Sequence, residues 1–167
     1  MSLKEINQLP ESEARARFLA CCHCRSWAAA LAAGRPFDSL EALLTEAETL
    51  WARCGEAEWL EAFSGHAKIG DIDALKKKFA TTTRAEQGQV LDADVAVLEE
   101  LRQRNIDYEN KYGFIFIVCA TGKSAEEMLQ LLKARMQRSR AQELQQAARE
   151  QGEITRLRLI KLWQQHP

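Results

Sequence analysis

The sequence predicts an all-α protein: a single-domain helical bundle over residues 1–167 with one short extended segment. Three observations lead to this prediction. Apolar residues recur at helical spacing along most of the chain. Glycine or proline stands at the end of several of these segments, at Gly34, Pro36, Gly55 and Gly65. The run from Phe114 to Val118 breaks the pattern, because it is rich in aromatic and β-branched residues. A chain of 167 residues is long enough for one domain to bury a core.

The first half of the chain predicts three helices. The first runs from about Ser12 to Ala33 and stops at Gly34 and Pro36, with a buried side that includes Phe18, Cys22 and Trp27. The second begins at Asp38, which has the spacing of a capping box with Glu41, and ends at Gly55. Its apolar positions are Leu40, Leu43, Leu44, Ala47, Leu50 and Trp51. A short third helix, residues 56–63, ends at Ser64-Gly65.

The second half continues the helical pattern. A short helix covers residues 72–80, and a threonine-rich loop leads into a long helix. This helix has Val90, Val97, Leu98 and Leu101 on one face. Ser124 and Glu127 form another capping box, before the apolar residues Met128, Leu131 and Leu132. Residues 153–163 close the chain. Four cations near the end of the preceding helix are interpreted as a solvated helix face: Lys133, Arg135, Arg138 and Arg140.

The extended run at Phe114 to Val118 has no second strand to pair with. Backbone N–H and C=O groups buried without a ladder partner must be satisfied in another way, and a bound polar ligand is one such way. The segment is therefore a candidate for ligand binding.

Composition excludes several classes of function. The net charge is −1 and no block of five or six like charges occurs, so a nucleic-acid partner is not expected. The longest apolar run, Phe114 to Ala120, is too short to cross a membrane. The first residues lack the apolar core of a signal peptide, so we expect a cytoplasmic protein.

The five cysteines include an odd one and are crowded at Cys21, Cys22 and Cys24. On a helix, the adjacent side chains of the run Cys21 to Cys24 cannot converge on one zinc ion. We interpret these cysteines as reduced, small apolar residues and expect no metal site.

Two motifs remain to be weighed. Gly122, Lys123 and Ser124 resemble the end of a phosphate-binding P-loop, but that loop requires a glycine where Ile117 stands. A turn and helix cap explain them more simply. His66 lies in a glycine-bounded turn, whereas His23 is in the first helix and His166 is near the C-terminus. Acid–base chemistry at His66 would need a carboxylate or other polar side chains nearby. Thr83, Glu86 and Gln87, at the start of a helix, are candidates for these groups.

Taken in order, the segments "HAKIGD", "TRAEQ" and "NIDYENKYGFIFIVCATGKS" resemble the 2-oxo-4-hydroxy-4-carboxy-5-ureidoimidazoline (OHCU) decarboxylase family over nearly the whole chain. The most specific part is the stretch from Asn105 to Ser124. Within it, the positions that match the family's spacing are Asn105, Tyr108, Lys111, Phe114, Gly122, Lys123 and Ser124.

The resemblance implies an all-α homodimer that works without a cofactor on a small ureidoimidazoline substrate, as a carboxy-lyase of urate degradation. It implies that His66 and Glu86 are catalytic. It also implies that the main chain of the extended segment lines the active site. The substrate-binding residues that it implies are Ala67, Thr83, Arg84, Ala85, Gln87, Phe116, Ile117, Val118, Cys119 and Ala120.

The chain departs from the family pattern at two positions. Ala67 replaces the usual proline after the histidine, and Thr121 stands where an arginine often follows the extended segment. Two other classes of function remain open: a non-enzymatic helical interaction module that uses the amphipathic C-terminal helix, and a nucleotide-binding protein that uses Gly122 to Ser124.

Overall fold

The computed structural model describes residues 1–66 and 92–164, and the side chains of the second range from residue 95 onward. Every regular element in these residues is an α-helix, which confirms the all-α prediction for the described part of the chain. The chain divides into two compact units, residues 1–66 with 148–167 and residues 67–147. A single domain over residues 1–167 stays a prediction. Among the helices described, none is long and apolar enough to cross a membrane.

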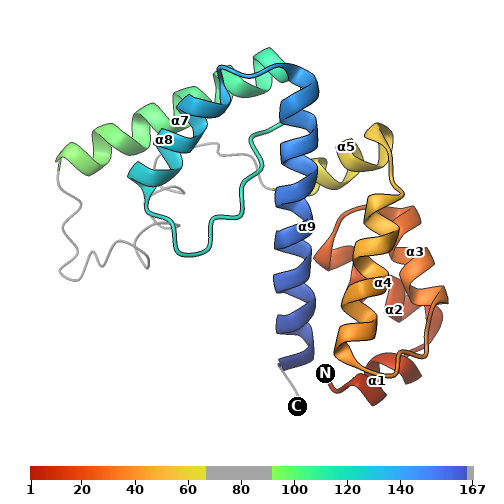
Figure 1. Ribbon diagram of the computed structural model, residues 1–167. Coiled ribbons are helices and arrows are strands. Elements are labelled where there is room, and N and C mark those ends of the chain that lie inside the picture. Colours follow the sequence, from red (N-terminus) through yellow and green to blue (C-terminus); the bar gives the residue numbers. More distant parts are fainter. Residues whose placement is uncertain (67–91, 165–167) are drawn as a thin grey trace. The chain divides into compact units, whose positions relative to one another are not determined.

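The first unit contains α1 to α5 and the C-terminal part of α9 (Figure 1). Helix α2 packs against α3, and α3 packs against α4. Large apolar side chains form the core, among them Phe18, Trp27, Leu31, Leu43 and Leu159. The bounds of these helices are α1, Leu3–Gln8; α2, Glu11–Cys21; α3, Arg25–Ala33; α4, Leu40–Ala52; α5, Glu56–Ser64; and α9, Arg140–Gln164.

The predicted continuous helix from Ser12 to Ala33 is wrong, because the chain is extended at Cys22 and Cys24, between α2 and α3. Both cysteines are fully buried, whereas His23 between them is exposed. In extended backbone, successive side chains point to opposite sides, so Cys22 and Cys24 share one side and are both buried, while His23 points the other way. On a helix, residues two apart face nearly opposite directions, and a core on one side could not take both. Burial of both thiols thus accompanies the break.

The helix starts follow local side-chain chemistry. Ser39, and not Asp38, is the N-cap of α4, since its Oγ accepts a hydrogen bond from the N–H of Ala42 at 3.0 Å. The predicted start at Asp38 is therefore wrong by one residue. Ser124 caps the next predicted helix as expected, and its Oγ accepts from the N–H of Glu127 at 3.2 Å.

The second unit contains α7 (Asp92–Tyr112), α8 (Ala125–Arg135) and the first residues of α9, and α7 packs against α8 (Figure 1). Leu98 and Leu101, which the sequence placed on one face of α7, are buried. Leu131 of α8 is 36% exposed, although the sequence placed it with the apolar face. Other buried residues of this unit are Tyr108, Tyr112, Met128, Leu129 and Leu132. The helix predicted over residues 72–80 and the residue Val90 lie outside the described residues.

Residues 113–124 connect α7 to α8 without helix or strand, which confirms that Phe114 to Val118 interrupts the helical pattern. Glycines with positive φ flank the segment, Gly113 at 84° and Gly122 at 77°. Left-handed backbone of this kind strains residues that carry a Cβ. The two glycines thus let the chain leave α7 and turn before α8.

Candidate active site

His66 stands directly after α5, where the helix end fixes its backbone. Gly65 is the C-cap and its N–H donates to the carbonyl of Ala62, while the N–H of His66 donates to the carbonyl of Phe63, both at 3.2 Å. Ala62 and Phe63 are buried and anchor this end of the helix. The prediction that the helix ends at Ser64-Gly65 is confirmed.

Gly65 has no room for a side chain. A Cβ built at this position would overlap the Cβ of His23 and lie 2.7 Å from its Cγ. His23 packs against the residue that precedes His66, a contact between the two histidine regions that no sequence pattern indicated. The lack of a side chain at residue 65 allows this close approach.

The imidazole of His66 is hydrogen-bonded to a glutamine from the other end of the chain. His66 Nε2 lies 2.5 Å from Oε1 of Gln151, a residue of α9 with no exposed surface. Gln151 Nε2 in turn donates to Oγ1 of Thr155, one turn further along α9, at 3.0 Å. The Nε2 edge of the imidazole thus faces the amide oxygen of Gln151. A buried amide therefore orients the ring of His66.

Cys22, which lies between α2 and α3, is a fully buried thiol. Burial raises the pKa of the Cys22 thiol to about 12 and outweighs the lowering effect of the Thr155 hydroxyl. Cys22 is consequently a neutral thiol at physiological pH. In the residues that the structure describes, no group of three or more His, Cys, Asp or Glu side chains is arranged to hold a metal ion.

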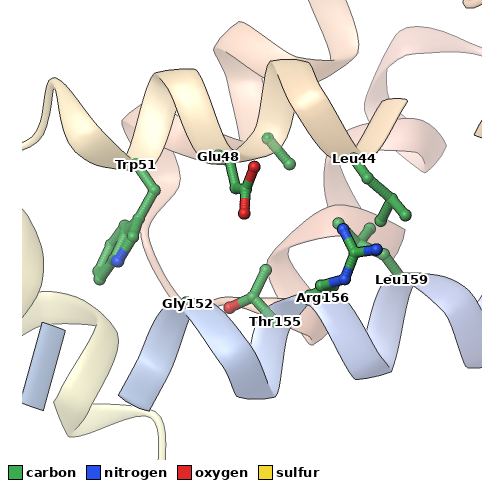
Figure 2. Close-up of a pocket in the computed structure, with 8 residues that line it drawn as sticks. Leu44, Glu48, Trp51, Gly152, Thr155, Arg156 and Leu159 are labelled. Atoms are coloured by element: carbon green, nitrogen blue, oxygen red, sulfur yellow. The ribbon is translucent and has the colours of Figure 1, made fainter. Parts of the chain in front are cut away.

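A small cavity lies between α4 and α9, and Figure 2 shows Glu48 and Thr155 facing it from these two helices. Its volume of about 20 Å³ corresponds to about one water molecule. Trp51 closes one end, and its indole N–H donates to the carbonyl of Ala148 at 2.8 Å. The cavity is too small for an organic substrate. The complete lining is Leu44, Ala47, Glu48, Trp51, Gly152, Thr155, Arg156 and Leu159.

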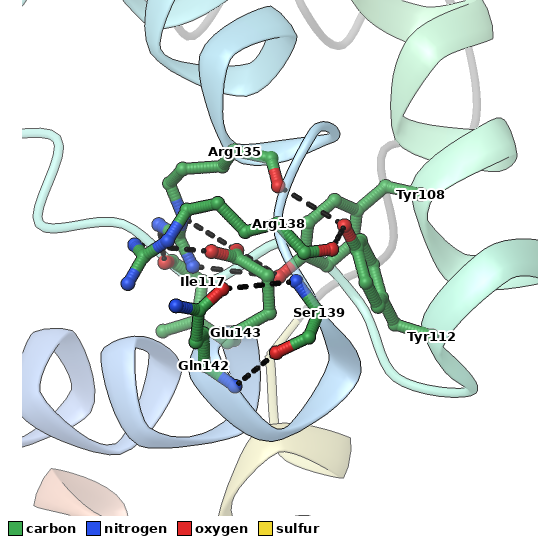
Figure 3. Close-up of polar contacts among 8 residues, drawn as sticks. All are labelled: Tyr108, Tyr112, Ile117, Arg135, Arg138, Ser139, Gln142 and Glu143. Atoms are coloured by element: carbon green, nitrogen blue, oxygen red, sulfur yellow. Dashed lines mark hydrogen bonds and ion pairs between the residues drawn. The ribbon is translucent and has the colours of Figure 1, made fainter.

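In the second unit, a buried ion pair supports the extended segment (Figure 3). Arg135 is only 6% exposed, so its assignment to a solvated helix face is wrong. Its Nε donates to Oε1 of Glu143 at 2.7 Å, and its Nη1 donates to the carbonyl of Ile117 at 2.7 Å. Glu143 belongs to the first turn of α9 and has no exposed surface. Its buried carboxylate is the physical reason that Arg135 turns inward.

The other members of the cationic group have different surroundings. Arg138 lies 3.3 Å from Oε2 of Glu143, and Arg140 Nε donates to the carbonyl of Tyr112 at 2.9 Å. Lys133 pairs with Glu100 at 3.0 Å and keeps a side chain that is 35% exposed. The predicted solvated face therefore describes Lys133, whereas the three arginines bind a carboxylate or backbone carbonyls of the second unit.

Tyr108 completes the ion-pair network. Its hydroxyl donates to Oε1 of Glu143 at 2.5 Å. Burial, followed by this hydrogen bond to the carboxylate, raises the pKa of Tyr108 well above its ordinary value of 10.0. The phenol therefore stays protonated and remains a donor.

The guanidinium of Arg135 also lies over the ring of Phe116, 4.6 Å from its centroid, and this contact adds a cation–π attraction.

These contacts decide how the peptide groups of the extended segment are oriented. The Ile117 carbonyl points to Arg135, and the Cys119 carbonyl accepts from Lys123 Nζ at 2.8 Å. In a trans peptide, the C=O and the following N–H point in opposite directions. The N–H groups of Val118 and Ala120 therefore point away from Arg135 and Lys123, respectively. The protein itself satisfies these two carbonyls, which the sequence had left without partners.

The structure describes only part of the predicted site. His66 is in the first unit, and the segment Phe116, Ile117, Val118, Cys119 and Ala120 is in the second. Phe116, Ile117 and Cys119 are buried, while Val118 and Ala120 are partly exposed. The remaining predicted residues lie outside the described residues: Ala67, Thr83, Arg84, Ala85, Glu86 and Gln87.

Sequence reasoning missed Gln151, Arg135 and Glu143. Gln151 had a detectable signal, because it occupies an apolar stripe of α9 at helical spacing with Ala148, Thr155 and Leu159. A glutamine in such a stripe is buried and needs a polar partner. Arg135 and Glu143 had no comparable signal, since charged residues at helix ends are ordinarily solvated.

Residues 7–160 match the family model described as OHCU decarboxylase. The chain belongs to the OHCU decarboxylase family. The match includes His66, the extended segment and Gln151, so each of the contacts above lies within the family domain.

Two relatives illustrate the range of the OHCU decarboxylase family. The uric acid degradation bifunctional protein TTL of Arabidopsis thaliana is 36% identical over 146 residues, which cover 86% of this chain and 45% of that protein. The chain thus spans less than half of the Arabidopsis protein. The 2-oxo-4-hydroxy-4-carboxy-5-ureidoimidazoline decarboxylase of Amia calva is 30% identical over 167 residues, which cover 95% of this chain and 93% of that protein.

Solved structures agree with this OHCU decarboxylase family assignment. A crystal structure of OHCU decarboxylase in the presence of (S)-allantoin matches with a TM-score of 0.73 and 34% identity, covering 87% of this chain and 96% of that one. A crystal structure of (S)-allantoin synthase matches with a TM-score of 0.72 at 19% identity, which supports the fold alone.

Proposed function

We propose that this chain is a carboxy-lyase that converts 2-oxo-4-hydroxy-4-carboxy-5-ureidoimidazoline to (S)-allantoin and carbon dioxide in urate breakdown. Membership of the OHCU decarboxylase family supports the reaction type, as does the name of the Amia calva relative. The contact between His66 and Gln151 supports His66 as the residue that transfers the proton, because a buried amide holds its imidazole at the end of α5. A histidine fixed in this way is suited to directed proton transfer.

The substrate itself supplies the electron sink. Carbon 4 carries a carboxylate and a hydroxyl, and carbon 5 belongs to an imine. When the bond between carbon 4 and the carboxylate breaks, its electron pair forms a double bond between carbons 4 and 5, and the imine electrons move to nitrogen. Carbon dioxide leaves, the ring nitrogen and carbon 5 each gain a proton, and the hydroxyl loses one to become the carbonyl of allantoin. The proposed reaction therefore needs no cofactor.

His66 moves the proton in this scheme, because imidazole gains and loses a proton near neutral pH. It takes the hydroxyl proton of carbon 4 or delivers a proton to one face of carbon 5. Delivery to one face makes the product chiral. Glu86 would orient His66 or the hydroxyl and repel the departing carboxylate.

The substrate is positioned by a second group of residues. The N–H groups of Val118 and Ala120, which point away from Arg135 and Lys123, are suitable donors for the carbonyl oxygens of the substrate ring and ureido group. Thr83 and Gln87 would add side-chain hydrogen bonds. The remaining contacts in this proposal come from Ala67, Arg84, Ala85 and the main chain of Phe116, Ile117 and Cys119. The resemblance also supports a homodimer, and we expect it to work in the cytoplasm.

The test is circular dichroism of freshly generated substrate, which two upstream enzymes make from urate. Spontaneous decay gives racemic allantoin, so a lasting (S)-allantoin signal in the presence of the protein measures the activity. We expect His66→Ala to lower the rate by about 10²–10⁴-fold, the range of a general acid–base group. His166→Ala is the matched control and should keep the wild-type rate.

Folded protein that leaves the decay at its spontaneous rate would contradict the proposed decarboxylase. The non-enzymatic helical interaction module would then be the better explanation. Activity in wild type that survives in folded His66→Ala would instead remove only the role of His66.

A further inference from the structure

We propose that Gln151 is a positioning residue that selects the tautomer of His66, so that Nε2 keeps its proton and proton exchange with the substrate takes place at Nδ1. This inference rests on the proposed function for its catalytic meaning, but the tautomer itself is independent of it. Neither the family match nor the sequence assigns a role to Gln151.

The geometry of the contact carries the first step. His66 Nε2 is 2.5 Å from the amide oxygen of Gln151, a short hydrogen bond. Neutral imidazole has one donor nitrogen and one acceptor nitrogen. With Nε2 committed as the donor to Gln151, the acceptor is Nδ1. In the protonated ring both nitrogens carry protons, and the proton on Nδ1 is the one that can leave without breaking this bond.

The direction of the Gln151 amide is the second step, because a flipped amide would select the opposite tautomer. Gln151 Nε2 donates to Thr155 Oγ1 at 3.0 Å. The amide nitrogen of Gln151 is the atom that faces Thr155, so the amide oxygen is the atom that faces His66. The hydrogen bonds of the network His66–Gln151–Thr155 therefore run in one direction, from His66 to Gln151 and from Gln151 to Thr155.

Burial is the third step. Gln151 has no exposed surface and Thr155 is 6% exposed, so the amide and the hydroxyl that bind each other lie in the protein interior. A buried amide that lost a partner would be left unsatisfied, which makes the network cooperative. The ring of His66, by contrast, is only partly buried. One edge of the imidazole is thus held in the protein interior.

The experiment is ¹⁵N NMR of the histidine side chains in the full-length protein, with His66 assigned from the missing signals of His66→Gln. Wild type should show one tautomer, with the proton on Nε2. In Gln151→Leu both tautomers should exchange, and the two nitrogen signals of His66 should move toward each other. Gln151→Glu keeps an acceptor oxygen and should retain the Nε2–H form. Its carboxylate should also shift the His66 titration to higher pH, which a purely structural role would not do.

Kinetics connect the tautomer to the reaction. We expect Gln151→Leu to lower kcat about 10- to 100-fold with a smaller change in KM, since orienting partners of a functional histidine have effects of this size. Thr155→Val should mix the tautomers as well, whereas Thr155→Ser keeps the hydroxyl and should retain the wild-type nitrogen signals. Gln145→Leu, at an exposed glutamine of the same helix, is the matched control and should keep wild-type activity.

Three results would overturn the proposal: a wild-type proton on Nδ1, unchanged nitrogen signals in folded Gln151→Leu and Thr155→Val, or mixed tautomers with an unchanged kcat. If Gln151→Leu does not fold, Gln151→Glu and Thr155→Val decide the same question. A wild-type protein that shows the Nε2–H form but does not convert the substrate would contradict the decarboxylase proposal and leave the tautomer assignment standing.

Discussion

Arg135 and Glu143 form an ion pair at 2.7 Å in the interior of the second unit, with side chains that are 8% and 0% exposed. The same guanidinium binds the Ile117 carbonyl, and the same carboxylate accepts from Tyr108. The pair therefore joins α7, α8, α9 and the extended segment. Each of these buried charges is compensated only while its partner is present, so removal of one partner leaves an unpaired charge in the interior.

Arg135→Met should destabilise the protein strongly. It leaves the buried Glu143 carboxylate without its main counter-charge, and breaking such a pair costs about 3–5 kcal/mol. Urea unfolding monitored by helical circular dichroism measures the change. Arg102→Met is the matched control, because Arg102 pairs with Glu99 at 2.6 Å on the surface. The free energy of unfolding should fall much less in this variant. Equal losses in the two variants would show that burial does not decide the effect.

Arg135→Lys should separate folding from substrate binding. Lysine keeps the positive charge but lacks the planar fork that reaches Glu143 and Ile117 together. If the extended segment holds the substrate, losing the bond to Ile117 should raise KM about tenfold, as expected for one hydrogen bond to a charged group. We expect kcat to change less. Steady-state kinetics of folded protein would argue against this reasoning if KM stayed at the wild-type value.

Gly65→Ala should destabilise the turn that carries His66, because the added Cβ meets His23. Overpacking of this kind costs about 1–3 kcal/mol. His23→Gly in the same chain removes the obstructing Cβ together with the ring, so the double variant should regain part of the loss in thermal unfolding. A double variant no more stable than Gly65→Ala would mean that the clash with His23 is not the cause.

Stability should fall at alkaline pH through the buried thiols. Burial raises the pKa of Cys21 from 9.0 to about 11 and that of Cys22 from 9.0 to about 12. Above pH 9 the unfolded chain releases these protons while the folded chain keeps them, so the unfolded state binds fewer protons. The free energy of unfolding should be insensitive to these groups below pH 9 and should decrease from there through about pH 11 to 12.

The variant Cys21→Ala/Cys22→Ala provides the control for the alkaline effect. Without the two thiols, the decrease in the free energy of unfolding between pH 9 and pH 10 should be shallower than in wild type. Chemical unfolding at a series of pH values measures both slopes. Parallel pH profiles would assign the alkaline loss to other groups, such as the buried Tyr108, whose pKa is also raised.

Several features of the fold could be predicted from the sequence because they depend on local chemistry. The cap at Ser124, the end of α5 at Ser64-Gly65 and the buried positions Leu98 and Leu101 depend on neighbours within a few residues. The same local reasoning failed at Cys22 and Cys24, because their burial depends on a core that distant helices complete. It also missed Ser39 by one residue, since Asp38 and Ser39 are both good N-caps and only the surrounding packing selects between them.

The sequence by itself determined the helical class of the protein, the non-helical run between α7 and α8, and His66 as the histidine to test. These follow from periodicity, residue type and motif order, which are properties of short stretches. Only the tertiary structure decided that Gln151 holds the ring of His66 and that Glu143 draws Arg135 to the carbonyl of Ile117. Buried polar groups must find partners wherever folding brings them together, and His66 and Gln151 are 85 residues apart in the chain.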